Sequence, residues 1–157
     1  MTVLYIIYKT IHILGVTALL GAGLRAAFFM WRANRTGDVS AIAAAARKSV
    51  RAHWLFTMPA AIIQPLSGIL LLSETGYGFD DAWVKLSLAL YALALASWLP
   101  AIWLQARIRD MALSAIGNGH ALPPLCRRHM RIWFGLGWLA LLSVIAIVTL
   151  MVQRPAL

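Results

Sequence analysis

Four long apolar runs alternate along the chain with short polar segments. Each run is roughly 20 residues or longer, the length that a helix needs to cross about 30 Å of hydrocarbon. The runs lack the strict alternation of a membrane β-strand, and a helix satisfies its backbone hydrogen bonds within itself. The sequence therefore predicts an all-α bundle of four transmembrane helices, in one membrane domain covering residues 1–157. The predicted spans are about 3–31, 54–72, 83–104 and 132–151.

Two polar segments extend the helices beyond these spans. Asp38 is a suitable N-cap for an Ala-rich helix over 41–46, which we expect to continue into span two. Span three is expected to continue to about Ile116, where a Gly-Asn-Gly sequence ends it. Pro59 and Pro65 predict a bend in span two.

The polar segments differ sharply in charge. Those after spans one and three each carry five Lys or Arg and one Asp, whereas residues 73–82 contain three acids and no Lys or Arg. The positive-inside rule then predicts that both basic segments are cytoplasmic and that both termini lie outside. Helices two and three are the ones expected to extend on the cytoplasmic side.

Composition supports a membrane protein. Of the 157 residues, 62% are hydrophobic and 12% are charged, against about 45–50% and about 25% in soluble domains. A chain of this size cannot bury so much apolar surface within itself, which excludes a soluble enzyme and a disordered chain. The lipid bilayer is therefore the expected partner. The net charge of +9 does not indicate nucleic acid, because most of the cations lie in two segments between spans.

Ionisable residues within the spans are candidates for a functional site, because they are costly in lipid unless they face protein. Three helix faces combine such a residue with small or polar ones, and small residues favour close helix packing. Lys9 lies one turn before the first face. The faces comprise His12, Gly15, Leu19, Ala22 and Ala26; Lys85, Ala89, Ala92 and Ala96; and His53, Thr57, Ala60 or Ala61, Gln64 and Gly68. We expect all three faces to point into the bundle.

Depth separates these candidates. His12 lies roughly 13 Å from the outer start of its helix, and Lys85 begins helix three on the outer side. His53 and His129 begin helices two and four at the cytoplasmic side, too far from His12 to share a ligand atom. The alternative roles are a hydrogen bond between helices for His12, snorkelling to headgroups for Lys85, and an interfacial position for His53. Three neighbouring arginines disfavour a metal or a proton at His129.

A buried imidazole in a helical bundle is a common axial ligand for b-type haem. Lys9 and Lys85 would balance an anionic substituent of the macrocycle, and His12 would bind the metal. His53 and His129 are further cofactor-binding candidates. The outer half contains no second histidine, so the site requires either a single axial His or a Lys or Met partner. The sequence contains no hydrolase triad, HExxH, Walker loop or GxGxxG.

Segments 8–14, 20–23, 54–59, 64–68, 98–100 and 133–137 resemble a bacterial family of predicted integral membrane proteins of unknown function. The resemblance covers nearly the whole chain. More distantly, the chain is similar to the HemJ-type protoporphyrinogen oxidases and to the CopD-type copper-resistance membrane proteins. In the oxidase family, a histidine in the first helix and a lysine opening the third act together. The resemblance places these roles on His12 and on Lys85, the latter as a catalytic residue.

The leading hypothesis is a multi-pass protein of the bacterial inner (cytoplasmic) membrane that binds haem b or a porphyrin in a redox role. Protoporphyrinogen-oxidase-like activity is one form of it, and whether the protein is an enzyme stays open. A homo-oligomer or a membrane redox partner is compatible with this hypothesis. The alternatives are a non-enzymatic scaffold that docks a partner through its basic loops, and a small metal permease.

Overall fold

The computed structural model describes residues 2–154, which are helical apart from short connections. α2, the π-helical turn η1 and α3 follow one another without a break, so this part of the chain forms four helical rods, each long and apolar enough to cross a membrane. The predicted all-α fold with four spans is confirmed. The elements are α1 (Val3–Thr36), α2 (Val39–Ala52), η1 (His53–Thr57), α3 (Met58–Thr75), α4 (Ala82–Asn118) and α5 (Pro124–Gln153).

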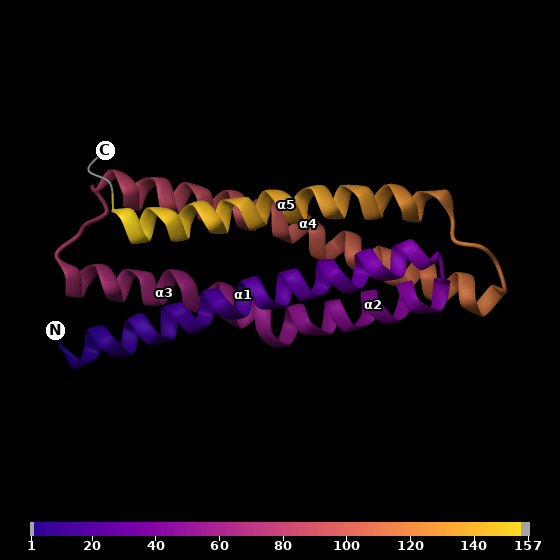
Figure 1. Ribbon diagram of the computed structural model, residues 1–157, viewed down its shortest axis with the longest axis horizontal. Helices are drawn as coiled ribbons and strands as arrows, with labels where there is room; N and C mark the ends of the chain where they lie inside the picture. The colour runs from indigo at the N-terminus through magenta and orange to yellow at the C-terminus, as the bar shows by residue number, and fades with distance from the viewer. Residues whose placement is uncertain (1, 155–157) are drawn as a thin grey trace.

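The two ends of the bundle differ (Figure 1). The terminal end carries the start of α1, the end of α5 and the α3–α4 loop. The basic end carries the α1–α2 turn and the α4–α5 loop, next to the two cation-rich segments. α4 has 37 residues and α1 has 34, or about 50–55 Å of helix. Both therefore exceed the roughly 30 Å of hydrocarbon and extend beyond it.

The helix ends follow from local sequence. Asp38 accepts a hydrogen bond from the backbone N–H of Ser40 at 2.8 Å and so caps α2, as predicted. Gly37 and Gly119 close α1 and α4 in the left-handed region, with φ of 68° and 66°. α4 ends at Asn118, within two residues of the predicted end. The Ala-rich helix over 41–46 is part of α2 and continues through η1 into the second span.

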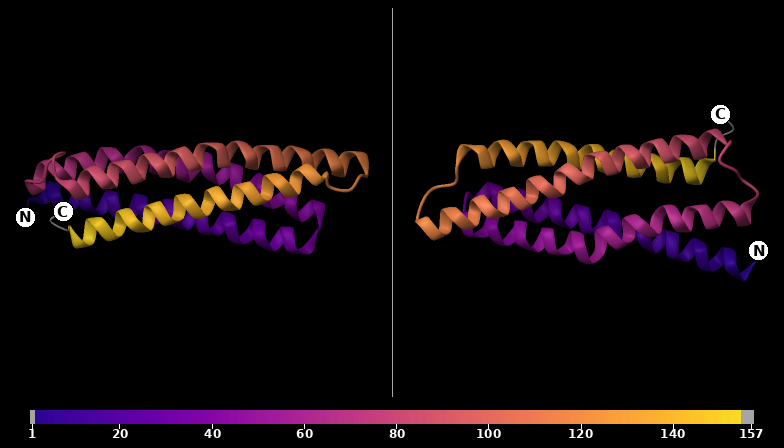
Figure 2. Two further views of the ribbon diagram at one scale, coloured as in Figure 1. Left: turned by 90° about the horizontal axis from the view of Figure 1, so that it is seen from above. Right: turned by 180° about the vertical axis from the view of Figure 1, so that it is seen from behind.

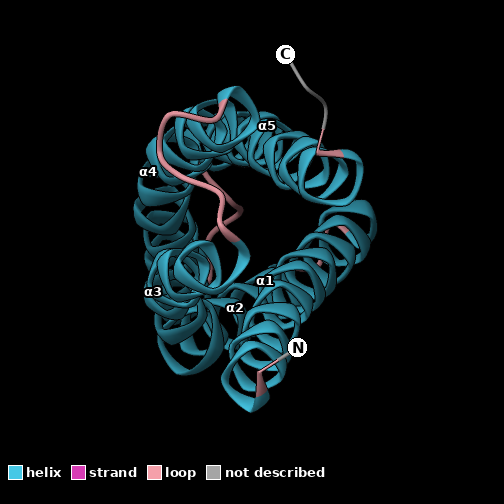
Figure 3. Cartoon of the chain, turned by 90° about the vertical axis from the view of Figure 1, so that its left-hand side faces the viewer, coloured by secondary structure: helices cyan, strands magenta, loops and turns pink. Residues whose placement is uncertain are grey.

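The helices pack as two pairs that meet at the basic end. α1 packs against α3 and α4 packs against α5, while α2 packs against α4 and α1. Figures 1 and 2 show the pairs converging toward the basic end, and Figure 3 shows the rods in a ring. A core of mostly small side chains joins the pairs there, because small residues let helices approach closely. Its buried members are Ala26, Met30, Ala33, Ile42, Ala43, Ala45, Ala46, Ala101, Leu104, Ile108, Ala112, Cys126, Met130 and Trp133.

Two of the three predicted inward faces are confirmed. Gly15 and Ala26 are buried on α1, and the seam from His53 to Gln64 is buried along η1 and α3. The third prediction is wrong, because all four members of the face that begins at Lys85 are exposed. α4 has small residues on a second face, which includes Ser87, Ala94, Ser97 and Ala101, and this face is buried.

Pro65 connects the two helix pairs indirectly. Proline has no backbone N–H, so the carbonyl oxygen of Ala61, four residues earlier, lacks its helical partner. The Tyr91 hydroxyl of α4 donates a hydrogen bond to that oxygen. The bond joins α3 to α4 in the terminal half of the bundle.

Candidate functional site

His12 is oriented by a side chain of the neighbouring helix. Its Nδ1 lies 2.8 Å from Oγ of Ser67 in α3, and the same Oγ lies 2.7 Å from the backbone oxygen of Ile63. A hydroxyl has one proton, and when Ser67 donates it to the Ile63 carbonyl, Oγ accepts the proton of His12 Nδ1. In this Nδ1–H tautomer, Nε2 carries a lone pair. No described residue donates a hydrogen bond to that nitrogen.

Close packing of α1 on α3 makes this contact possible. The side-chain amide of Gln64 donates to the backbone oxygen of His12 at 3.0 Å. A Cβ atom at Gly15 would lie 2.1 Å from that amide nitrogen, so only glycine leaves room for it. A Cβ at Gly68 would lie 3.5 Å from Cε1 of His12. The backbones of both helices thus come near one another at the level of the imidazole.

His12 lines a cavity of about 330 Å³ between the two helix pairs, toward the terminal end. The wall is mostly apolar, and all four rods contribute to it. A second cavity of about 690 Å³ lies toward the basic end. Leu19, Tyr91 and Val144 line both, so the two cavities adjoin at the level of the Tyr91 hydrogen bond.

The rim of the His12 cavity is cationic. Lys9 and Arg154 line it, and no Asp or Glu of the described residues does. Both side chains lie over aromatic rings, with Nζ of Lys9 5.5 Å from the Tyr5 centroid and Cζ of Arg154 5.2 Å from the Tyr77 centroid. The cavity therefore combines an apolar interior and one imidazole with positive charge at its edge.

Lys85 does not belong to this site. Its side chain is 62% exposed, its Nζ lies 3.5 Å from a carboxylate oxygen of Asp80, and it lines neither cavity. The prediction that Lys85 points inward beside His12 is wrong. A lysine at the start of a span reaches the polar boundary without turning inward, because its long side chain extends along the helix to water.

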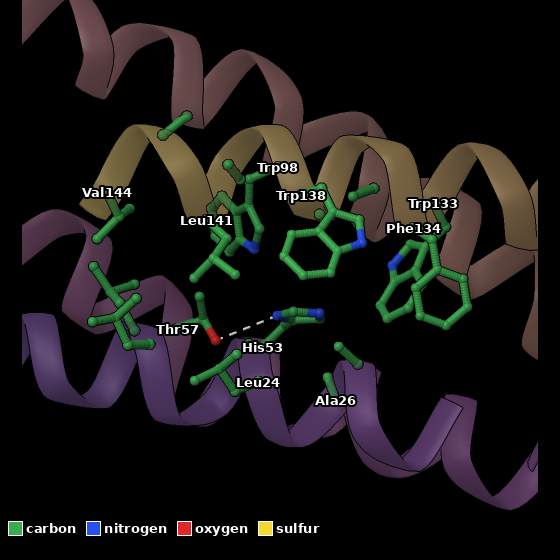
Figure 4. Close-up of a pocket in the computed structure, with 18 of the residues that line it drawn as sticks. Leu24, Ala26, His53, Thr57, Trp98, Trp133, Phe134, Trp138, Leu141 and Val144 are labelled. Atoms are coloured by element: carbon green, nitrogen blue, oxygen red, sulfur yellow. Dashed lines mark hydrogen bonds between the residues drawn. The ribbon is translucent and has the colours of Figure 1, made fainter. Parts of the chain in front are cut away.

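His53 faces the larger cavity, but both of its ring nitrogens are engaged. Nε2 lies 2.8 Å from Oε1 of Gln105, which is fully buried, and Nδ1 lies 3.3 Å from Oγ1 of Thr57. Figure 4 shows the ring within the cavity with its bond to Thr57. The Trp98 ring meets it edge-on with the centroids 6.0 Å apart. His53 therefore links η1 to α4 and has no free lone pair.

The remaining histidines lie apart from both cavities. His129 lies beside the Trp103 ring, with the centroids 6.0 Å apart, and its buried Nδ1 has no partner among the described residues. His120 is exposed in the α4–α5 loop. Within residues 2–154, no group of three or more His, Cys, Asp or Glu could hold a metal ion. A metal at His12 would need a macrocycle to supply most of its ligands.

The family model for "Predicted integral membrane protein (DUF2269)" matches residues 6–155. The chain belongs to this family. No curated protein and no solved structure matches it, and the resemblance to HemJ-type and CopD-type proteins stays a prediction.

The structure adds site residues of this DUF2269 protein that sequence reasoning missed. Ser67 lies three residues after Gln64, so the polar seam on the second helix could have been extended to include it. Arg154 lies one turn after Met151, beyond the apolar run of α5. Gln105 lies one turn after Ala101 on the buried face of α4, a position that becomes evident only once that face is known.

Proposed function

We propose that the protein binds haem or a related porphyrin in the His12 cavity, with His12 Nε2 as an axial ligand, and that it serves a redox role in the membrane. The observation that carries this proposal is the 2.8 Å contact between His12 Nδ1 and Oγ of Ser67, which accepts a proton in the Nδ1–H tautomer. Histidines that bind a metal usually donate the other ring N–H to a neighbouring acceptor, which fixes both tautomer and ring orientation. The Ser67 contact is a bond of this kind.

The cavity fits an amphiphilic, flat ligand. Its interior is apolar, and its volume of about 330 Å³ lies within the range of ordinary small-molecule sites, which run from about 300 to 1,000 Å³. Lys9 and Arg154 at the rim are suited to pair with the carboxylates of a porphyrin, and a guanidinium can bind a carboxylate through two hydrogen bonds. Lys9 and Arg154 would thus balance the anionic substituents of the macrocycle, the role that the sequence analysis assigned to Lys9 and Lys85.

Met151 lines the same cavity and is the candidate second axial ligand. A His/Met pair is a known haem ligation and raises the reduction potential of the iron. His53 does not fit this role, because both of its nitrogens bond to protein. Haem iron, when bound, supplies one-electron exchange; the chain supplies the ligand, the cationic rim and an apolar surrounding.

The proposal includes an orientation in the bacterial inner membrane, with the basic end in the cytoplasm. It is supported by the five cations in each basic segment and by the acidic 73–82 segment at the opposite end. Alkaline phosphatase fused in the 73–82 loop is expected to be active, and the same enzyme fused in the α4–α5 loop inactive. The reverse pattern would contradict the orientation.

The haem proposal is tested by absorbance. Protein purified in a mild detergent, with haemin supplied during expression or afterwards, is expected to show a Soret band that shifts on reduction. The His12→Ala variant is expected to lose it. His120→Ala is the matched control, because it removes an exposed imidazole far from both cavities.

One result would overturn the whole proposal, and a second would overturn its ligand assignment. The first is wild-type protein that binds neither haemin nor protoporphyrin in stoichiometric amount. The second is a His12→Ala variant that keeps the full band, which would reject the ligand assignment and leave porphyrin binding itself in place.

A further inference from the structure

The larger cavity carries a second, independent site. Its volume is about 690 Å³, and its wall is built from α1, η1, α3, α4 and α5. Aromatic side chains surround His53 within it: Trp98, Trp133, Phe134 and Trp138 (Figure 4). The His12 site does not use this space.

One hydrogen-bond donor in this wall is buried and unpaired, and a second faces the cavity. Nε1 of Trp98 is buried without a partner among the described residues. Trp133 lines the same cavity, and its indole is largely buried. Figure 4 shows both indole nitrogens turned toward the space around His53. A buried unpaired N–H costs roughly 1–3 kcal/mol, so the Trp98 donor, with the Trp133 indole N–H turned to the same space, indicates a ligand with acceptor atoms.

The cavity opens toward lipid. Leu24, Phe28 and Trp138 line it, yet each side chain is more than half exposed on the outside of the bundle. They lie on α1 and α5, which pack against each other over only a short stretch. A ligand would therefore enter sideways, between α1 and α5, from the hydrocarbon layer.

We infer that this cavity binds an isoprenoid quinone. A quinone ring is flat, carries carbonyl oxygens that accept hydrogen bonds, and bears an apolar tail. The oxygens would accept the N–H groups of Trp98 and Trp133, the ring would lie among the aromatic side chains beside His53, and the tail would leave between α1 and α5. A phospholipid acyl chain would fill the same space but would leave both donors unpaired.

The test compares two ligands that differ only in the carbonyl groups. Menadione and 2-methylnaphthalene are added to detergent-solubilised protein, and binding is measured by equilibrium dialysis against protein-free micelles. Menadione is expected to bind at least tenfold more tightly. Trp98→Phe and Trp133→Phe keep an aromatic ring but remove the donor, and each is expected to weaken menadione about 3- to 10-fold. Neither should change the affinity for 2-methylnaphthalene.

Trp54→Phe and Trp103→Phe are the matched controls, because both indoles are exposed and line neither cavity. Should a Phe variant fold poorly, photo-crosslinking of an azidoquinone to the wild-type protein replaces it, and labelling of α1 and α5 around Leu24 and Trp138 is the supporting result. Three results would overturn the inference. They are equal affinity for both ligands, unchanged menadione binding when Trp98→Phe and Trp133→Phe are combined, and a dimer that closes the opening and binds no quinone.

The inference does not rest on the proposed haem site. Trp98 and Trp133 line the larger cavity alone, so their Phe variants are expected to keep any Soret band. Conversely, His12→Ala is expected to keep menadione binding. Failure of one site is thus distinguishable from failure of the other.

Discussion

His12 and His53 both face the interior of the bundle, yet their surroundings give them different chemistry. Each ring contacts a polar side chain of a neighbouring rod at 2.8 Å. His12 has a partner on Nδ1 alone among the described residues, whereas His53 has a partner on each nitrogen. Burial alone therefore does not identify a ligand. The number of ring nitrogens already bonded to protein does.

The largest expected effects come from replacing each of the two histidines by alanine. His53→Ala leaves the fully buried Gln105 without its partner and opens space beside Trp98, at a cost of about 2–4 kcal/mol. We expect Tm in detergent to fall by roughly 5–15 °C, while the haemin-loaded variant keeps its Soret band. His12→Ala is expected to do the reverse, losing the band with a smaller fall in Tm. Equal loss of haem in both variants would remove the distinction between them.

Ser67→Ala sharpens the comparison at the His12 site. It removes the acceptor of the Nδ1 proton, and loss of such an outer partner typically weakens metal affinity about 10–100-fold. A haemin titration measures this. Ser87→Ala is the control, because Ser87 also lines the cavity and is buried, but bonds only to the Trp83 carbonyl of its own helix. If both variants weaken haemin equally, the Ser67 bond has no special role.

Gly15→Ala tests the close approach of α1 and α3. A Cβ 2.1 Å from the Gln64 amide nitrogen must displace that side chain and break its bond to the His12 carbonyl. We expect destabilisation of about 1–2 kcal/mol in thermal unfolding. Gly21→Ala, where a Cβ meets nothing within 4 Å, is expected to be neutral or slightly stabilising. In a Gln64→Ala background, Gly15→Ala should cost little, and a full cost there would contradict the contact.

The smallest effects concern the cations. Lys9→Ala and Arg154→Ala are each expected to weaken haemin about 2- to 5-fold, because exposed ion pairs contribute roughly 0.2–1 kcal/mol. Lys85→Ala is expected to leave haemin affinity unchanged, since Lys85 pairs with Asp80 outside the cavity. A larger effect at Lys85 than at Arg154 would restore the sequence-based assignment.

The spans, the helix extensions and the cap at Asp38 could be predicted because each depends on residues adjacent in sequence. The inward face of α1 could also be predicted, since small residues gather on one side of it. On α4 the same reasoning failed, because small residues occupy two sides and only tertiary packing selects between them. The partners Ser67 and Gln105 depend on the axial offset between helices, which hydropathy and periodicity do not encode.

The π-helical turn at His53–Thr57 has a consequence for how this chain tolerates deletions. A π turn accommodates one residue more than the α-helix around it. Removing a single codon from this stretch would relax the turn to ordinary α-helix, and Gln64 and Ser67 would still face α1. A one-codon deletion in residues 58–63 has no extra residue to absorb it and would rotate Gln64 and Ser67 by about 100°. A reading frame that still encodes four spans would then have lost the imidazole's anchor.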